Sequence, residues 1–157
     1  TDIGGFFAVC DFGFEAWTAG DRLFVGFSSG TTAVVTVQPS TLFNIFGFCI
    51  EAGDTAITLL HNDGAGSGTK DTITGQPTVA TNQGYRAYLY CKPNDNVVYW
   101  RLDDLNTGLK IDEGSVSTDL PVNTTFLCFQ SIMSNGANTP VNSARIGVGN
   151  IYLRAQS

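Results

Sequence analysis

Paired carboxylates and a single histidine are the residues of this chain that could carry acid–base chemistry. The histidine, His61, follows two leucines and precedes a polar turn, and nothing in the sequence supplies the nucleophile and orienting acid of a catalytic triad. We expect it to be an ordinary residue at a strand end.

Two carboxylates can hydrolyse a glycoside when they flank the bond, and the candidates are Asp103 with Asp104, Asp112 with Glu113, Asp11 with Glu15, and Glu51 with Asp54. Adjacent residues in a strand point to opposite faces, so we predict no active pair and no enzyme activity.

The glycine-rich loop over residues 62–69 has some features of a ligand-binding loop. Asn62, Asp63 and Gly64 are similar to the start of a calcium loop, but the further oxygen ligands and closing glutamate of an EF-hand are missing. The alternate glycines neither match the dinucleotide fingerprint nor open a helix. We therefore predict no cofactor and no metal, although the sequence leaves open a looser calcium site of the kind found in some lectin folds.

The four cysteines each lie inside a short apolar run. Free cysteine behaves as a small hydrophobic residue when buried, and a chain of 157 residues is long enough to form a core without disulfides. No Cys-x-x-Cys pair is present, so a zinc site would need scattered ligands. We predict four reduced, slowly reactive thiols in a protein that folds in a reducing cytoplasm.

Aromatic residues are the remaining candidates for ligand binding. Several lie near turns or in half-exposed strands, where a sugar ring could stack on them: Trp17, Tyr85, Tyr99 and Trp100. Neighbouring Asn, Asp and Arg side chains would form hydrogen bonds with sugar hydroxyls. The predicted ligand-binding residues are Trp100, Arg101, Asn62, Asp63, Asn135 and Asn138. The alternative is that the aromatic rings fill the core or a subunit interface, because aromatic residues dominate both.

Composition excludes several classes of partner. Hydrophobic residues are 43% of the chain, charged residues are 14%, and the net charge is −6 with an isoelectric point near 4.4. The eight cationic residues are scattered along the sequence, so neither nucleic acid nor an anionic membrane surface is an expected partner. No apolar run approaches the ~20 residues of a spanning helix, so we predict no membrane insertion.

The elements that must position these side chains are β-strands. Short runs rich in Val, Ile, Phe, Tyr and Thr alternate with Gly, Asn, Asp and Ser clusters, and no long window has helical periodicity. The predicted strands are residues 5–15, 22–28, 33–37, 45–50, 57–62, 70–73, 84–91, 96–103, 108–117, 124–131 and 143–154. One helical turn at most is predicted within residues 39–46, and a hairpin turn at Asn106-Thr107-Gly108, where glycine can take a positive φ.

Several predicted strands alternate between a drier and a wetter face, which is typical of antiparallel sheets. In residues 84–91 one face carries Tyr85, Ala87, Leu89 and Cys91, and the other carries Arg86, Tyr88 and Tyr90. In residues 96–102 the two faces carry Val97, Tyr99 and Arg101 against Val98, Trp100 and Leu102. The patterns predict one all-β domain over residues 1–157, an antiparallel β-sandwich. Because residue 1 is threonine rather than methionine, we expect a fragment of a longer chain.

Three blocks of the sequence resemble a module found near the C-termini of tailed-bacteriophage virion proteins, tail-fibre proteins especially. The blocks are YWRLDDLNTGLKIDEGSVSTDLPVNTTFL at residues 99–127, RLFVGFSS at residues 22–29, and HNDG through GTK at residues 61–70. The likeness covers about residues 20–155 and depends on the order and spacing of the blocks. It implies a β-sandwich of the jelly-roll or concanavalin-like lectin type, displayed on a phage particle, and it implies no enzyme chemistry.

From this resemblance we expect the distal receptor-binding part of a tail fibre, which recognises a host cell-surface glycan without cleaving it. The expected partners are a host surface polysaccharide and other phage virion subunits. The expected assembly is a homotrimer, since fibre modules commonly trimerise. The protein would assemble in the host cytoplasm and reside in the virion. Two alternatives stay open: a structural virion protein without ligand, as a capsid decoration or fibre trimerisation module, and a polysaccharide depolymerase.

Overall fold

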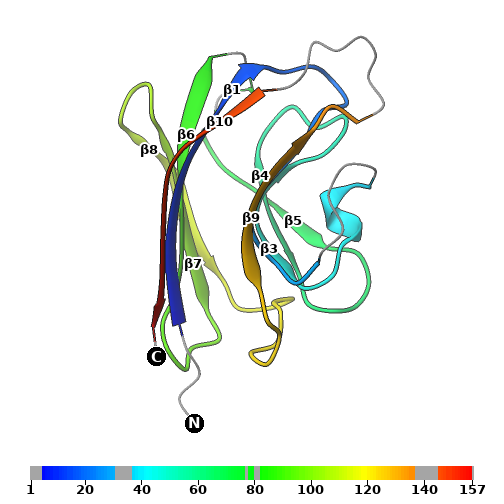
Figure 1. Ribbon diagram of the computed structural model, residues 1–157, viewed down its shortest axis with the longest axis vertical. Coiled ribbons are helices and arrows are strands. Elements are labelled where there is room, and N and C mark those ends of the chain that lie inside the picture. The colour runs from blue at the N-terminus through cyan, green and yellow to red at the C-terminus, as the bar shows by residue number, and fades with distance from the viewer. Residues whose placement is uncertain (1–4, 31–36, 77, 80–81, 137–144, 157) are drawn as a thin grey trace.

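Two antiparallel five-stranded sheets pack face to face in the computed structural model (Figure 1). The structure describes residues 5–30, 37–76, 78–79, 82–136 and 145–156. Sheet A has the strand order β10-β1-β6-β7-β8, and sheet B has the order β5-β4-β3-β2-β9. β1 pairs with β10, so the first and the last described strands lie side by side at one edge of sheet A. The predicted all-β, antiparallel β-sandwich is therefore confirmed.

The bounds of the elements follow the alternation of apolar runs and turns. Sheet A contains β1 (Gly5–Ala16), β6 (Gln83–Cys91), β7 (Val98–Asp104), β8 (Lys110–Val116) and β10 (Arg145–Gln156). Sheet B contains β2 (Arg22–Ser28), β3 (Ile45–Ile50), β4 (Thr58–Asn62), β5 (Thr69–Thr72) and β9 (Cys128–Ser134). A single turn of 3-10 helix, η1 (Pro39–Thr41), lies between β2 and β3.

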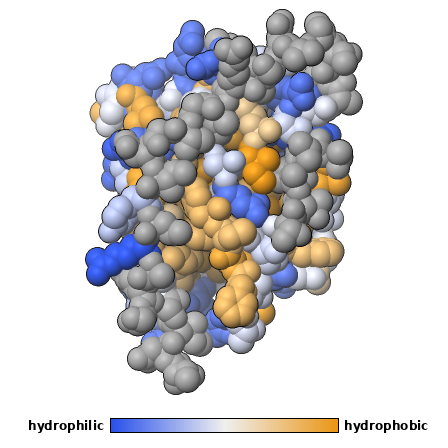
Figure 2. Space-filling model, in the orientation of Figure 1, coloured by the Kyte–Doolittle hydropathy of each residue, from blue (hydrophilic) through white to orange (hydrophobic). Residues whose placement is uncertain are grey.

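Apolar side chains between the two sheets form the main core. Successive residues of a strand point to opposite faces, so every second residue of the central strands enters this layer. Ring contacts join the sheets: Phe6 lies 4.5 Å from Phe27, and Trp100 lies 6.2 Å from Phe48 in an edge-to-face arrangement, measured between ring centroids. Figure 2 shows apolar side chains in a band between the two layers, with polar side chains on either side.

The outer face of sheet B carries a second, smaller core. Phe24, Ile45, Cys49 and Leu60 are fully buried there, with Leu42 and Ile132 packed against them. A strap of residues 38–44, which includes η1, covers this face on the side away from sheet A (Figure 1).

Hydrogen bonds from sheet B and its loops hold the strap. Asn62 donates its side-chain amide to the Leu42 carbonyl at 2.9 Å, and the Gly68 N–H donates to the Ser40 carbonyl at 2.8 Å. The Ser40 N–H in turn donates to the Glu51 carboxylate at 2.7 Å. Because the strap supplies these partners, the outer face of sheet B is closed to ligands where the second core lies.

Most predicted strands agree with the observed ones to within a few residues, and the predicted helical turn is η1. The strand predicted over residues 124–131 begins only at Cys128, which is a correction. Its first residues form a turn in which the Thr125 N–H donates to the Val122 carbonyl at 2.9 Å. The strand predicted over residues 33–37 lies outside the described residues except for Val37, which is not in a strand.

The β7–β8 hairpin has the predicted turn. Gly108 has a φ of +72°, and its N–H donates to the Asp104 carbonyl at 2.8 Å. The Asp104 N–H donates to the Leu109 carbonyl at 2.9 Å, which closes the hairpin. The register shifts between Leu102 and Asp103, so the hairpin is of the bulged kind expected for a longer loop.

All four cysteines are free, as predicted. Cys10 and Cys49 are buried, and burial raises the pKa of the Cys10 thiol to about 11 and that of Cys49 to about 12. Cys91 is half-buried, and Cys128 is exposed on β9. The exposure of Cys128 argues against four slowly reactive thiols, because β9 is an edge strand and Cys128 is exposed on it.

We predict that a thiol reagent will divide the cysteines into two classes. The thiolate is the reactive species, so Cys10 and Cys49 should react only when the protein unfolds. Cys128 should react first in the native protein, and Cys91 more slowly. Timed alkylation followed by peptide mass spectrometry measures this order, and rapid native labelling of Cys49 would contradict the packing of the second core.

Candidate functional site

The outer face of sheet A carries a dense set of aromatic and charged side chains. Residues opposite one another in neighbouring strands lie on the same face. The registers of β1, β6, β7 and β8 place three rows there. The first row is Phe7, Tyr90, Tyr99 and Ser115; the second is Val9, Tyr88, Arg101 and Glu113; the third is Asp11, Arg86 and Asp103.

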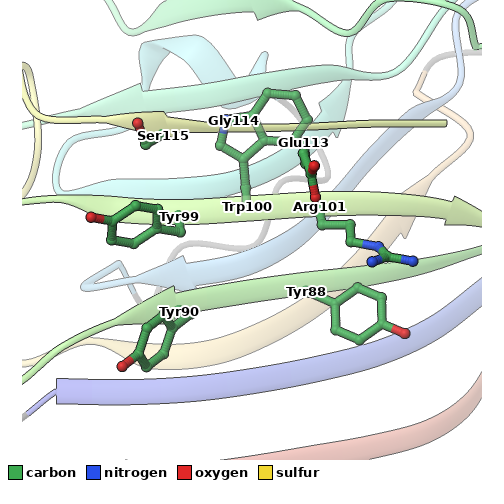
Figure 3. A pocket seen from close by; sticks show the side chains of 8 residues that line it. All are labelled: Tyr88, Tyr90, Tyr99, Trp100, Arg101, Glu113, Gly114 and Ser115. Atoms are coloured by element: carbon green, nitrogen blue, oxygen red, sulfur yellow. The ribbon is translucent and has the colours of Figure 1, made fainter. Parts of the chain in front are cut away.

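A shallow depression of about 420 Å³ opens on this face between β6 and β8 (Figure 3). Its lining comprises Tyr88, Tyr90, Tyr99, Trp100, Arg101, Glu113, Gly114 and Ser115. The centroids of the Tyr90 and Tyr99 rings are 6.1 Å apart, and the two ring planes are tilted by 33°, so the rings lie side by side on this face. The guanidinium carbon of Arg101 lies 5.5 Å from the centroid of the Tyr88 ring, and Figure 3 shows the group extending toward that ring.

Two bidentate ion pairs fix the arginines of this face. Arg101 donates to the Asp103 carboxylate through Nε at 2.6 Å and Nη2 at 3.0 Å. Arg86 donates to Asp11 through Nε at 2.5 Å and Nη2 at 2.7 Å. These hydrogen bonds raise the pKa of both guanidinium groups. The planar fork of arginine matches a carboxylate in this geometry, so each guanidinium is held in one orientation before any ligand binds.

Trp100, a predicted ligand-binding residue, belongs to the main core. The alternation of β7 points Tyr99 and Arg101 outward and Trp100 inward, where its side chain is 9% exposed. Its ring passes beneath Gly114, where an added Cβ would lie 2.9 Å from Trp100 Cζ2. The structure therefore separates Trp100 from Arg101, and only an edge of the indole reaches the lining of the depression.

Asn62 and Asp63 lie on the other sheet, at the end of β4. The Asn62 side chain is fully buried and donates to the strap, while its Oδ1 atom has no hydrogen-bond partner among the described residues. Asp63 accepts hydrogen bonds from the N–H groups of Gly64 and Ala65, in the turn that it begins. The Asn62 side chain thus holds the strap, and the Asp63 side chain stabilises the turn of the β4–β5 hairpin.

Asn135 lies at the opposite end of sheet B from Asn62. Ser134, the residue before it, pairs with Arg22 at the start of β2, whereas Asn62 pairs with Ile45, which pairs with the end of β2. The seven residues of β2 span about 20 Å at 3.4 Å per residue. Asn138 lies outside the described residues. The structure therefore does not bring together the five described residues among those that were predicted to bind a ligand.

His61 is more constrained than a strand-end residue needs to be. Its side chain is 3% exposed and lies between two aspartates, with Nε2 3.2 Å from Asp71 Oδ2 and Nδ1 3.2 Å from the Asp119 carbonyl oxygen. Asp119 also accepts hydrogen bonds from the Asp63 N–H at 3.1 Å and the Thr69 hydroxyl at 2.7 Å. These contacts tie the β8–β9 connection to the β4–β5 hairpin.

The described part of the chain contains neither a candidate metal site nor a candidate membrane-spanning helix. No group of three or more His, Cys, Asp and Glu side chains is placed there to hold a metal ion. No described helix has the length and hydropathy to span a bilayer.

Tyr88 and Tyr90 are the aromatic residues of the depression that the sequence analysis did not name as candidates for ligand binding. Their signal was the alternation in residues 84–91, which placed them with Arg86 on the face opposite Tyr85 and Leu89. That face is now seen to be the outer one, because Tyr85 and Leu89 are buried in the core. The position of residues next to Trp100 in the sequence was a weaker guide to the site than this alternation.

Two solved structures align with the fold of this chain. A crystal structure of the family 18 polysaccharide lyase aly-SJ02 aligns with a TM-score of 0.52 and 8% sequence identity, covering 98% of this chain and 73% of the lyase chain. Peanut lectin with a nine-residue peptide aligns with a TM-score of 0.49 and 8% identity, covering 84% of this chain and 68% of the lectin chain. No protein-family model matches the chain, and no curated protein matches it in sequence. At 8% identity the lyase shows the fold alone, and the predicted jelly-roll or concanavalin-like lectin type is confirmed.

We predict that Asp119→Asn will destabilise the protein in a pH-dependent way. Burial raises the pKa of this carboxyl, but hydrogen bonds from Thr69 and the Asp63 N–H and the charge of His61 lower it overall. A carboxyl whose pKa is lower in the folded state stabilises the fold above its unfolded pKa, and this stabilisation is lost as the pH falls through the folded pKa. The loss at neutral pH should be about 1.5–3 kcal/mol, as for hydrogen bonds to a charged group.

Urea denaturation across a pH series measures this effect. Asparagine also tolerates the positive φ of residue 119, which is 51°, so the variant tests the charge rather than the backbone. Asp71→Asn is the matched control, because the Asp71 side chain is 49% exposed and its loss should cost far less. A stability difference that persists unchanged into acid would refute the role given to the Asp119 charge.

Proposed function

We propose that the outer face of sheet A binds a bacterial surface glycan without cleaving it. The observation that carries this proposal is the placement of Tyr88, Tyr90 and Tyr99 beside Arg101 in one depression. Tyr99 is 37% exposed, and its ring lies beside that of Tyr90 with 33° between the two ring planes. A pyranose ring has an apolar face of C–H groups, which can cover such a pair of rings.

The polar groups around the rings suit a ligand rich in hydroxyls. Arg101 is held by Asp103 and lies over Tyr88, so it needs little further ordering when a ligand binds. The hydroxyls of the three tyrosines and of Ser115 can each donate or accept a hydrogen bond. A binding site made of fixed rings and fixed donors is expected to recognise shape and hydroxyl pattern.

Binding without catalysis is supported by how the carboxylates of this face are used. Glu113, which lines the depression, accepts a hydrogen bond from Lys110 at 2.6 Å. Asp103 and Asp11 each hold an arginine. Hydrolysis by two carboxylates requires one of them to protonate the leaving group, whereas each of these three carboxylates is engaged by a cationic side chain.

The phage assignment is supported by the sequence resemblance, and we propose the receptor-binding module of a tail fibre located in the virion. The polysaccharide lyase that shares the fold supports the broader proposal of a glycan ligand. A structural virion protein without ligand, and a depolymerase, are the competing functions. Incubation with host polysaccharide separates the depolymerase from a binder, because only the depolymerase releases new chain ends.

We predict that Tyr90→Ala and Tyr99→Ala will each weaken adhesion to susceptible cells and to a bacterial glycan array. One stacked ring contributes on the order of 1 kcal/mol, which is roughly a fivefold change in affinity. Tyr99→Phe should retain most of the binding because it keeps the ring.

Phe43→Ala is the matched control, since Phe43 is 49% exposed in the strap of sheet B, away from the depression. Far-ultraviolet circular dichroism verifies that each variant is folded. If the folded parent protein binds no glycan on the array and does not adhere to host cells, the structural role should replace the binding role.

We also propose that the protein is a homotrimer. Exposed apolar side chains outside the depression support this: Phe126 is 96% exposed and Val122 60% exposed, both in the β8–β9 connection. Burial of such groups between subunits would stabilise an assembly. A trimer would also carry three copies of the depression, and multivalency raises the avidity of individually weak sites.

Light scattering tests the trimer. We expect a mass of three times 16.7 kDa, and a shift toward the monomer in a Val122→Ser, Phe126→Ser double variant. A monomer mass for the parent protein over a wide concentration range would show that these side chains are not buried between copies.

A further inference from the structure

An aromatic ladder extends the depression across sheet A. The ladder consists of Tyr99, Tyr90, Phe7 and Tyr152, one from each of β7, β6, β1 and β10. Consecutive ring centroids are 6.1, 6.2 and 6.0 Å apart. Tyr152, at the far end, is 52% exposed. The ladder therefore crosses the four strands and continues beyond the residues that line the depression, with a diagonal last step because Tyr152 is paired in register with Val9 rather than with Phe7.

The direction of the ladder suits a polymer better than a terminal sugar. Neighbouring strands are about 4.8 Å apart, which is similar to the length of one pyranose unit along an extended chain. The ring planes of Tyr90 and Tyr99 are tilted by 33° from each other, and that of Phe7 is tilted by 71° from Tyr90 and by 61° from Tyr152. A chain that crosses the strands can thus meet a new ring at each successive strand.

The cationic residues of the protein gather on this same face. Five of the eight lie there: Arg86, Arg101, Lys92, Lys110 and Arg154. Three of the five are in ion pairs, with Asp11, Asp103 and Glu113.

The other two cations have no carboxylate partner among the described residues, and they flank the two ends of the ladder. Lys92 Nζ lies 5.3 Å from the centroid of the Tyr99 ring. Arg154 is paired in register with Phe7, and its side chain is exposed. In a chain of net charge −6, the ladder is thus a local region in which positive charge is left uncompensated at each end.

We propose that the ladder binds an anionic polysaccharide, whose sugars stack along the rings while its acidic groups contact Lys92 and Arg154. This inference rests on the proposed function and narrows its ligand class. It also fixes the path of the chain, across the strands from β7 to β10. Arg101, whose charge is compensated by Asp103 inside the depression, then binds hydroxyls, and the two outer cations select for charge.

Binding of the full chain to four immobilised polysaccharides tests the proposal. Polygalacturonate and hyaluronan are anionic, sulfated dextran adds a different acidic group, and dextran is the uncharged control. We expect the anionic polymers to bind more tightly than dextran, and binding to weaken as salt screens the charges. Sulfated dextran distinguishes a general preference for anions from one for carboxylates, and a preference for either kind of anion over dextran supports the inference.

Charge variants locate the contacts. Lys92→Gln and Arg154→Gln should each weaken binding of the anionic polymers by about two- to fivefold and reduce its salt dependence, whereas Lys92→Arg and Arg154→Lys should retain it. Tyr152→Ala should weaken binding of a six-sugar fragment of polygalacturonate but leave that of a two-sugar fragment unchanged.

The following outcomes distinguish failure of the anionic-ladder proposal from failure of the glycan-binding proposal. Salt-independent binding with a preference for dextran would overturn the anionic ladder and leave glycan binding intact. The same conclusion would follow if the two glutamine variants bound anionic polymers as well as the parent protein does. Absence of binding to all four polymers, to the bacterial glycan array and to host cells would overturn both proposals.

Discussion

The alternate orientation of side chains along β6 and β7 is the constraint on which the rest of sheet A depends. Each strand supplies one set of residues to the core and the other to the outer face, so neither set can change its position independently. Tyr85 and Leu89 anchor β6 between the sheets, and that anchoring holds Tyr88 and Tyr90 on the surface. The burial of Trp100 does the same for Tyr99 and Arg101 in β7. The surface rings therefore have a rigid base.

The two outer faces of the sandwich differ because of one loop. On sheet B, the strap of residues 38–44 supplies a cover, and the strand pair beneath it contains Gly26 opposite Gly47. A Cβ on either glycine would collide with the backbone of the other strand, so β2 and β3 approach closely there. No described segment covers the rows of Tyr88 and Tyr90 on sheet A in this way. Among the described residues, exposed aromatic side chains on an uncovered sheet face are thus found on sheet A, which is why that face is the candidate site.

The sequence was a good guide to the strands and a poor one to the site, for a physical reason. Strand patterns such as that of residues 84–91 depend on neighbours in the chain, and they predicted both the sheets and the alternation. The site depends on which strands become adjacent, and Phe7 meets Tyr90 only through the β1–β6 pairing. The same limit explains the cations, which are scattered in the sequence but gather on one face of sheet A. Trp100 was misjudged because neither face of its strand could be identified as the inner one from the pattern alone.

The second core gives the molecule two levels of local stability. Its four fully buried residues lie on the opposite side of β2, β3 and β4 from the main core, so loss of the strap would expose them and leave the contacts between the sheets intact. Regions with few buried contacts open more often than the global fold, on a free-energy scale that amide hydrogen exchange reports. The Gly68 amide, which donates to Ser40 in the strap, belongs to the less stable level. Exchange there would follow opening of the strap, while the amides of β1 and β6 would exchange only when the sandwich itself comes apart.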